Sequence, residues 1–182
     1  MRIHDPKQAI SEYVSTIEPN PSPFSTIHQP QQLNVANRIA TLRFFQMRSL
    51  PHRQLHEVTF ENEEGQQERW LCFVIQDEQG DWSVRSAGKV SASPVRSHPW
   101  ANLMGGGRED DFWAGGLVMD NDLGVERVHL IAANGSMLDD IVQEHLVLFI
   151  TDQKVQMPLQ VELYDRSGNL IATHTFPWQL HP

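Results

Sequence analysis

Residues 158–173, PLQVELYDRSGNLIAT, contain the pattern of a complete β-hairpin. Leu159, Val161 and Leu163 alternate with polar residues, which is the period of a strand with one buried face. Residues 165–169 have the composition of a turn, and apolar residues return directly after it. We therefore predict two antiparallel strands here, joined by a tight turn.

The same spacing of short strands extends back to residue 125. Strands are expected at 125–130, 137–142 and 146–150, and Asn134-Gly135 between the first two is a strong hairpin signal. Short strands about every 8–12 residues, separated by turns, are typical of a β-sandwich or barrel. In this rhythm the last third of the chain resembles immunoglobulin-like and fibronectin-like sandwiches. The resemblance covers roughly 55 residues, lacks any Cys…Trp…Cys pattern and implies no function.

A second group of strand patterns follows Pro51. Strands are expected at 55–60, 69–76 and 82–85, joined by acidic, glycine-containing turns into a meander. The middle one, RWLCFVIQ, is a largely apolar run, consistent with burial on both faces. Cys72 lies inside this run and is predicted to be a small core residue, because a nucleophilic thiolate needs exposed, electropositive surroundings.

The N-terminal part lacks these strand patterns. Asp5 is a good N-cap for an amphipathic helix over residues 6–17, whose first residue is a proline. The proline-rich residues 19–32 predict an extended linker. Residues 34–50 fit both a helix and a strand, and the prediction is a strand over 39–48 because its threonine and phenylalanines favour strands.

Together these patterns predict a mainly β fold. We expect an antiparallel β-sandwich, immunoglobulin-like in the rhythm of its C-terminal third, with a short N-terminal helix. Residues 1–32 would hold the helix and the linker, and residues 33–182 would form a single β-sandwich domain. Two half-sandwiches joined by an aperiodic segment, residues 86–117, are the alternative.

Charge and composition limit the classes of partner. The 182 residues carry 14 Lys and Arg against 23 Asp and Glu, a net charge of −9. An acidic protein repels phosphate backbones, so no nucleic-acid partner is expected. No apolar run approaches the ~18 residues of a membrane span, and no secretory signal is visible, so no membrane partner is expected. The single cysteine excludes an internal disulfide, and the prediction is a cytoplasmic protein.

Residues 86–117 contain several glycines and large aromatic side chains but neither a helical nor a strand period. Long aperiodic stretches in compact domains are usually functional or disordered, and aromatic residues argue against disorder. Two interpretations stay open: the rings close one end of the core, or the segment is a binding lid with glycine hinges. Trp113 is expected to be buried and Trp100 to be more exposed. The candidate binding residues are His98, Trp100, Arg108, Glu109, Asp110, Asp111 and Trp113.

The sequence contains no motif for catalysis or for metal binding. The nine histidines form no HxH or HExxH pattern, and residues 120–126 fail the ligand spacing of an EF-hand. Asp139 and Asp140 are adjacent, so on extended backbone their carboxylates face opposite sides and cannot act on one bond. No catalytic residue, cofactor or metal is therefore predicted.

The function that these observations favour is a non-enzymatic interaction or binding module. No motif identifies the partner, which is a protein or a small molecule. No motif identifies the oligomeric state of the chain. The alternative is a small-molecule-binding protein or an enzyme with a pocket roofed by the glycine-rich residues 98–116. The two hypotheses differ in whether that segment borders a concave pocket.

Overall fold

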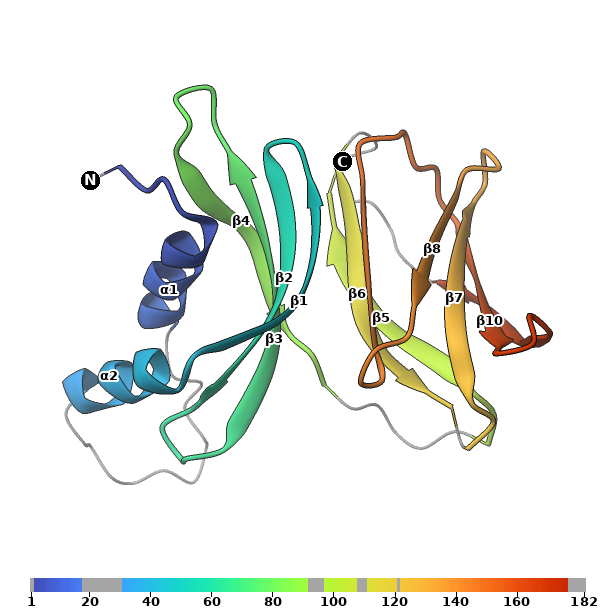
Figure 1. Ribbon diagram of the computed structural model, residues 1–182, viewed down its shortest axis with the longest axis horizontal. Helices are drawn as coiled ribbons and strands as arrows, with labels where there is room; N and C mark the ends of the chain where they lie inside the picture. The colour runs from blue at the N-terminus through green and yellow to red at the C-terminus, as the bar shows by residue number, and fades with distance from the viewer. Residues whose placement is uncertain (1, 18–30, 92–96, 108–110, 121, 177–182) are drawn as a thin grey trace. The chain divides into compact units, whose positions relative to one another are not determined.

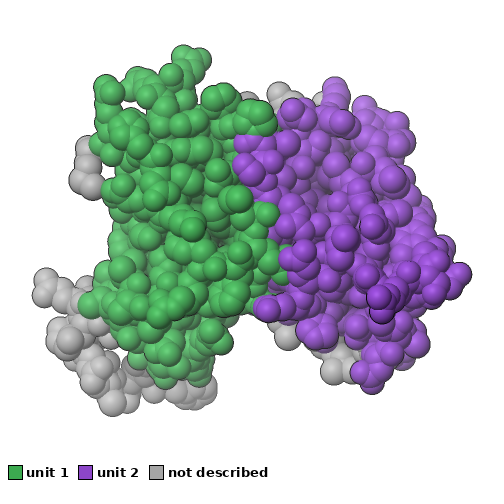
Figure 2. All heavy atoms as spheres, in the orientation of Figure 1, with its two compact units in different colours: residues 1–47, 51–89 green, residues 48–50, 90–182 purple. Residues whose placement is uncertain are grey.

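The computed structural model describes residues 2–17, 31–91, 97–107, 111–120 and 122–176. Within them the chain forms eleven strands in three sheets and two short helices, so the predicted mainly β fold with an N-terminal helix is confirmed (Figure 1). The chain divides into two compact units, Met1–Met47 with Pro51–Lys89 and Arg48–Leu50 with Val90–Pro182 (Figure 2). The domain boundaries 1–32 and 33–182 stay a prediction, which the number of unfolding transitions would test. None of the described helices is long and apolar enough to cross a membrane.

The first unit is a four-stranded meander accompanied by two helices. Its sheet has the order β1-β2-β3-β4, and the pairs β2–β3 and β3–β4 are antiparallel. The meander predicted from the turns therefore forms, with one further strand before it. The elements are α1 (Pro6–Thr16), α2 (Gln31–Thr41), β1 (Arg43–Leu50), β2 (Arg53–Glu61), β3 (Gln67–Gln76) and β4 (Trp82–Lys89). The last three residues of β1, Arg48–Leu50, are grouped with the second unit.

Helix α1 begins where the sequence predicts because Asp5 caps it. The Asp5 carboxylate accepts a hydrogen bond from the Lys7 backbone N–H at 2.9 Å. Cys72 is fully buried in the core beneath this helix, and burial raises the pKa of its thiol to about 12. The thiol therefore stays protonated, and its predicted place in the core is confirmed. The core joins Ala9, Ile10 and Val14 of the helix to Val58, Phe60, Cys72, Val74 and Trp82 of the sheet.

The strand predicted over residues 39–48 is wrong at its start, because helix α2 continues through the first of these residues and β1 begins at Arg43. The cause is a set of tertiary contacts. Arg38 is only 3% exposed, donates a hydrogen bond to the carbonyl oxygen of Ile17 after α1, and pairs with Glu63 in the β2–β3 turn. These contacts connect segments distant in the sequence, so they can override an ambiguous local propensity.

The second unit is a β-sandwich. Seven strands form a sheet of order β5-β6-β9 and a sheet of order β11-β10-β7-β8, and one apolar core takes side chains from both. Two antiparallel sheets on a shared core are the architecture that the strand rhythm predicts. The strands are β5 (Trp100–Gly106), β6 (Phe112–Met119), β7 (Val125–Ala132), β8 (Met137–Ile141), β9 (Leu146–Thr151), β10 (Leu159–Asp165) and β11 (Leu170–Phe176).

The expectation of an aperiodic loop over residues 86–117 is wrong for most of its described part. β4 extends to Lys89, and β5 and β6 pair as antiparallel strands. β6 is the middle strand of its sheet and is buried along most of its length, which hides the period of two. A Cβ atom on Gly116 would lie 2.0 Å from the carbonyl oxygen of Asn102 on β5. This glycine therefore permits a close approach of two strands and is no hinge.

Candidate functional site

The two tryptophans of the predicted lid are both buried. Trp113 on β6 is 2% exposed, as expected. Trp100 is 6% exposed, so it is the more exposed ring by only a small margin and is not the partly exposed ring that a binding lid would have. Trp100 is already a paired strand residue opposite Met119 and does not belong to a loop. Neither ring therefore offers an exposed binding surface.

The other predicted site residues are not brought together by the described structure. His98 is exposed and precedes β5, whereas Asp111 is half-buried and precedes β6. Because β5 and β6 are antiparallel, these two residues lie at opposite ends of the hairpin. Arg108, Glu109 and Asp110 lie outside the described residues, and a binding role for them stays a prediction.

A different set of side chains gathers on the surface of the four-stranded sheet that faces away from the core. Val128 and Leu130 of β7 are buried in the core, so Arg127, His129 and Ile131 project to the opposite side. The strand registers arrange the outward residues in three rows. We call this surface the outer face. Its rows are Ile141, Arg127, Tyr164 and Leu170; Asp139, His129, Glu162 and Thr173; and Met137, Ile131, Gln160 and Thr175.

The centre of the outer face is a pair of rings. The centroids of His129 and Tyr164 lie 4.5 Å apart with the ring planes at 42°. The Tyr164 hydroxyl donates to one carboxylate oxygen of Glu162, and the Gln160 amide donates to the other at 2.6 Å. The hydrogen bond to Glu162 raises the pKa of Tyr164, so the hydroxyl stays protonated at neutral pH. The Tyr164 ring is therefore held in position as a neutral group.

An ion pair borders this ring pair on the β8 side. Arg127 Nη1 lies 2.5 Å from Asp139 Oδ2, and both side chains remain nearly half exposed. The next residue, Asp140, is 7% exposed and points to the other side of the strand. The predicted opposite orientation of these adjacent carboxylates is therefore confirmed.

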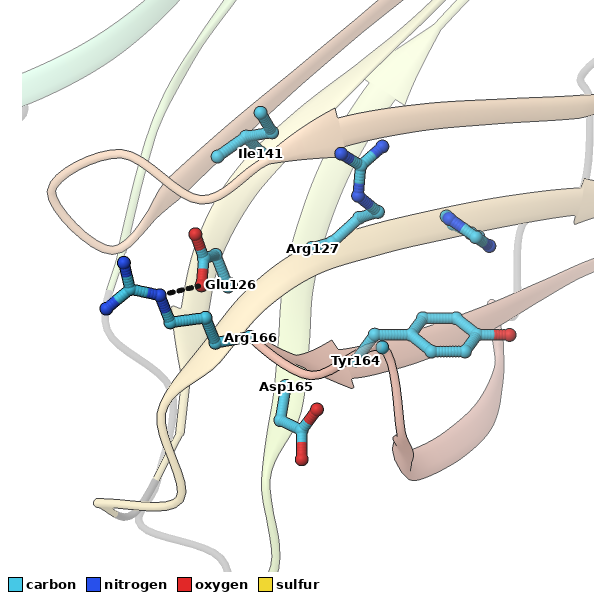
Figure 3. A pocket seen from close by; sticks show the side chains of 8 residues that line it. Glu126, Arg127, Ile141, Tyr164, Asp165 and Arg166 are labelled. Atoms are coloured by element: carbon cyan, nitrogen blue, oxygen red, sulfur yellow. Dashed lines mark ion pairs between the residues drawn. The ribbon is translucent and has the colours of Figure 1, made fainter.

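Beside Tyr164 the outer face is hollowed into a pocket of about 250 Å³ (Figure 3). Arg166, in the β10–β11 turn, reaches Glu126 near the start of β7, with 4.0 Å between Nε and Oε2. The Asp165 carboxylate is held within its own turn by hydrogen bonds from the side chain and the backbone of Asn169. These hydrogen bonds also lower the pKa of Asp165. The pocket therefore combines two acids and two arginines with the ring pair and an apolar wall.

The groups on the outer face are suited to binding. Rings, apolar side chains, carboxylates and guanidinium groups recognise a partner by shape, ring contact and charge. Among the residues that the structure describes, no group of three or more His, Cys, Asp or Glu side chains could hold a metal ion.

A buried histidine, His56, lies in the first unit and is not part of the outer face. His56 is 2% exposed, lies 2.7 Å from the Gln54 amide oxygen through Nε2, and meets the Phe44 ring edge-on. Burial, followed by the nearby charge of Lys7, lowers the pKa of His56 to about 4. The ring is neutral at physiological pH and closed to solvent, so it serves the packing of this unit.

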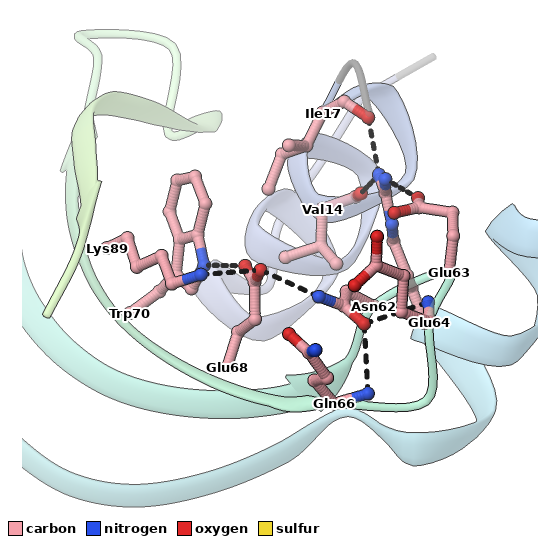
Figure 4. Close-up of polar contacts among 10 residues, drawn as sticks. Val14, Ile17, Asn62, Glu63, Glu64, Gln66, Glu68, Trp70 and Lys89 are labelled. Carbon is pink, nitrogen blue, oxygen red and sulfur yellow. Dashed lines mark hydrogen bonds and ion pairs between the residues drawn. The ribbon is translucent and has the colours of Figure 1, made fainter. Parts of the chain in front are cut away.

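A polar cluster near the β2–β3 turn is also structural. Burial alone would raise the pKa of Glu68, but hydrogen bonds from Lys89, Trp70 and Asn62 outweigh it and lower the pKa below its usual range (Figure 4). The carboxylate is charged and its contacts tie β3 to β4 and to the turn. Its oxygens are engaged within the fold.

None of the outer-face residues was among the predicted site residues. The alternation of Gln160, Glu162 and Tyr164 with buried residues, and the solvent-facing position of His129, are readable in the sequence. Their proximity is not, because it depends on the register between strands. No protein-family model, no curated protein and no solved structure matches the chain.

Proposed function

We propose that this chain is a non-enzymatic interaction module and that the outer face is its docking surface for a protein partner. The observation that carries the proposal is the placement of exposed apolar side chains around the ring pair. Met137, Ile141 and Leu170 are 54%, 44% and 53% exposed and all lie on this face. Aromatic residues, methionine and arginine are enriched at protein interfaces, and this face presents all three beside exposed isoleucine and leucine side chains.

The ring pair supports the proposal further. Tyr164 contacts the His129 ring and donates a hydrogen bond to Glu162, and side chains that already have such contacts lose less conformational entropy when a partner covers them. Tyrosine and arginine are enriched among residues that dominate binding energy. A cytoplasmic location is part of the same proposal, and the buried, unpaired Cys72 is consistent with a reducing compartment.

The chain offers a matched pair of leucines for the test. Leu170 on the outer face is 53% exposed, and Leu123 in the β6–β7 turn is 56% exposed but belongs to none of the three rows of that face. Proteins captured from a cell extract by the tagged wild type should also be captured by Leu123→Ser and lost with Leu170→Ser. Capture that is unchanged by Leu170→Ser, or no capture by the wild type, would contradict the proposal.

A further inference from the structure

We propose that the pocket beside Tyr164 receives the guanidinium group of an arginine from the partner protein, in place of the chain's own Arg166. This inference rests on the proposed function and adds the chemistry of the partner. Three properties of the pocket carry it: the charge around it, the weakness of one ion pair inside it, and the rings that form its wall.

The charge around the pocket favours a cation. The two acids and two arginines that line the pocket balance, and the excess of negative charge comes from Asp139 and Glu162, which flank His129 on the same face. Acids thus exceed bases here, in a chain whose net charge is −9. Such a field attracts a positively charged partner and orients its approach.

The carboxylates differ in how firmly they are engaged. Asp139 has Arg127 at 2.5 Å, Glu162 accepts two side-chain hydrogen bonds, and Asp165 accepts those of its turn. The Glu126 carboxylate faces Arg166 at 4.0 Å, the limit of an ion pair. Glu126 is therefore the acid that an incoming cation can bind while breaking the fewest existing interactions.

Arg166 indicates which cation fits. Its side chain is 92% exposed and Glu126 is 49% exposed, so their pair is highly solvated and contributes little stability. Figure 3 shows Arg166 extending from its turn toward Glu126 at the edge of the pocket. A guanidinium group of the chain itself thus already lies near the position that we assign to the partner's arginine, and it can move into solvent when displaced.

The walls of the pocket suit the rest of an arginine side chain. The neutral Tyr164 ring offers a flat surface on which a planar guanidinium group can stack. Ile141 supplies an apolar wall for the methylene groups. The volume of about 250 Å³ lies below the roughly 300–1,000 Å³ of sites for whole small molecules, and it suits one side chain.

The experiment uses two small probes that differ in charge and hardly in shape. N-acetyl-arginine methylamide and the neutral N-acetyl-citrulline methylamide are titrated into the labelled full chain at low salt, and backbone amide shifts are followed by NMR. The arginine probe should shift the amides of Glu126, Tyr164 and Arg166 in a saturable way. The citrulline probe should bind at least about tenfold more weakly, because it cannot form the charge-assisted bond to Glu126.

Three variants assign the effect to the pocket. Glu126→Gln should abolish saturable binding of the arginine probe, whereas Asp152→Asn, which removes one exposed acid elsewhere, should leave it within about twofold. Arg166→Gln should tighten binding severalfold because the internal competitor is gone. Equal shifts from both probes, or binding unaffected by Glu126→Gln, would overturn the inference.

The outcomes separate this inference from the proposed function. If Leu170→Ser abolishes partner capture while the arginine probe does not bind at Glu126, the outer face docks a partner but the inference is overturned. If the probe binds at Glu126 while capture does not depend on the outer face, the proposed function is wrong and the pocket is a cation site only.

Discussion

The Asp140 carboxylate accepts a hydrogen bond from the Leu148 backbone N–H at 2.8 Å, and so links β8 of one sheet to β9 of the other. Arg48, which belongs to the same compact unit, donates to the other carboxylate oxygen from Nε at 3.1 Å. Asp140 is 7% exposed, so both bonds form away from bulk water. One buried acid thus holds β8, the edge strand of the sheet that carries the outer face.

Asp140→Ala should lower the free energy of unfolding by roughly 2–4 kcal/mol, because it leaves the buried Leu148 N–H without its acceptor and removes the ion pair with Arg48. The matched control is Asp139→Ala at the neighbouring, exposed position, where the loss should stay below about 1 kcal/mol. Chemical denaturation of both variants measures the difference. Equal losses would mean that Asp140 does not link the sheets.

Gly116→Ala should be severely destabilising, by at least about 3 kcal/mol, since its Cβ would overlap the Asn102 carbonyl oxygen of the neighbouring strand. Gly124 has a φ of +65° and open space around its Cβ position, so Gly124→Ala should cost only about 1 kcal/mol of backbone strain. A folded, stable Gly116→Ala protein would favour the hinge that the sequence suggested.

Trp100→Ala and Trp113→Ala should each lower the free energy of unfolding by roughly 3–5 kcal/mol, because both rings are buried. Urea denaturation of the two variants is the measurement. A loss under about 1 kcal/mol for Trp100→Ala would restore the exposed ring that the sequence predicts.

The neutral His56 should make the first unit sensitive to mild acid. The pKa of His56 is about 4 in the folded state against 6.5 in the unfolded chain. The unfolded state therefore binds more protons between these values, and stability falls as the pH is lowered through this window. The contribution is on the order of 3 kcal/mol when complete.

His56→Phe should flatten this pH dependence of the free energy of unfolding by about one proton. An NMR titration of the His56 ring gives its pKa directly. A value near 6.5 would show that the ring is not buried in solution.

The sequence predicts a strand most accurately where one face of that strand is buried and the other is exposed to solvent. Leu159, Val161 and Leu163 alternate with polar residues because β10 has one side in the core, and that strand lies where it was expected. The same signal fails for β6, which is buried along most of its length and contains Gly116 where the neighbouring strand allows no side chain.

The candidate site depends on relations that a single stretch of sequence does not contain. Tyr164 and His129 are visible as outward residues of their own strands, but their stacking follows from the register of β10 on β7. Glu126 and Arg166 are 40 residues apart and meet only because the β10–β11 turn lies beside the start of β7. The glycine and tryptophan content of residues 98–116 pointed instead to a segment whose described part is mostly strand.

The most direct test of the outer face as a docking surface is the dissociation constant of a captured partner for three proteins: wild type, Leu170→Ser and Leu123→Ser. Docking on the outer face predicts that Leu170→Ser weakens binding by about tenfold or more, while Leu123→Ser stays within about twofold of the wild type. Equal dissociation constants for Leu170→Ser and the wild type would contradict it.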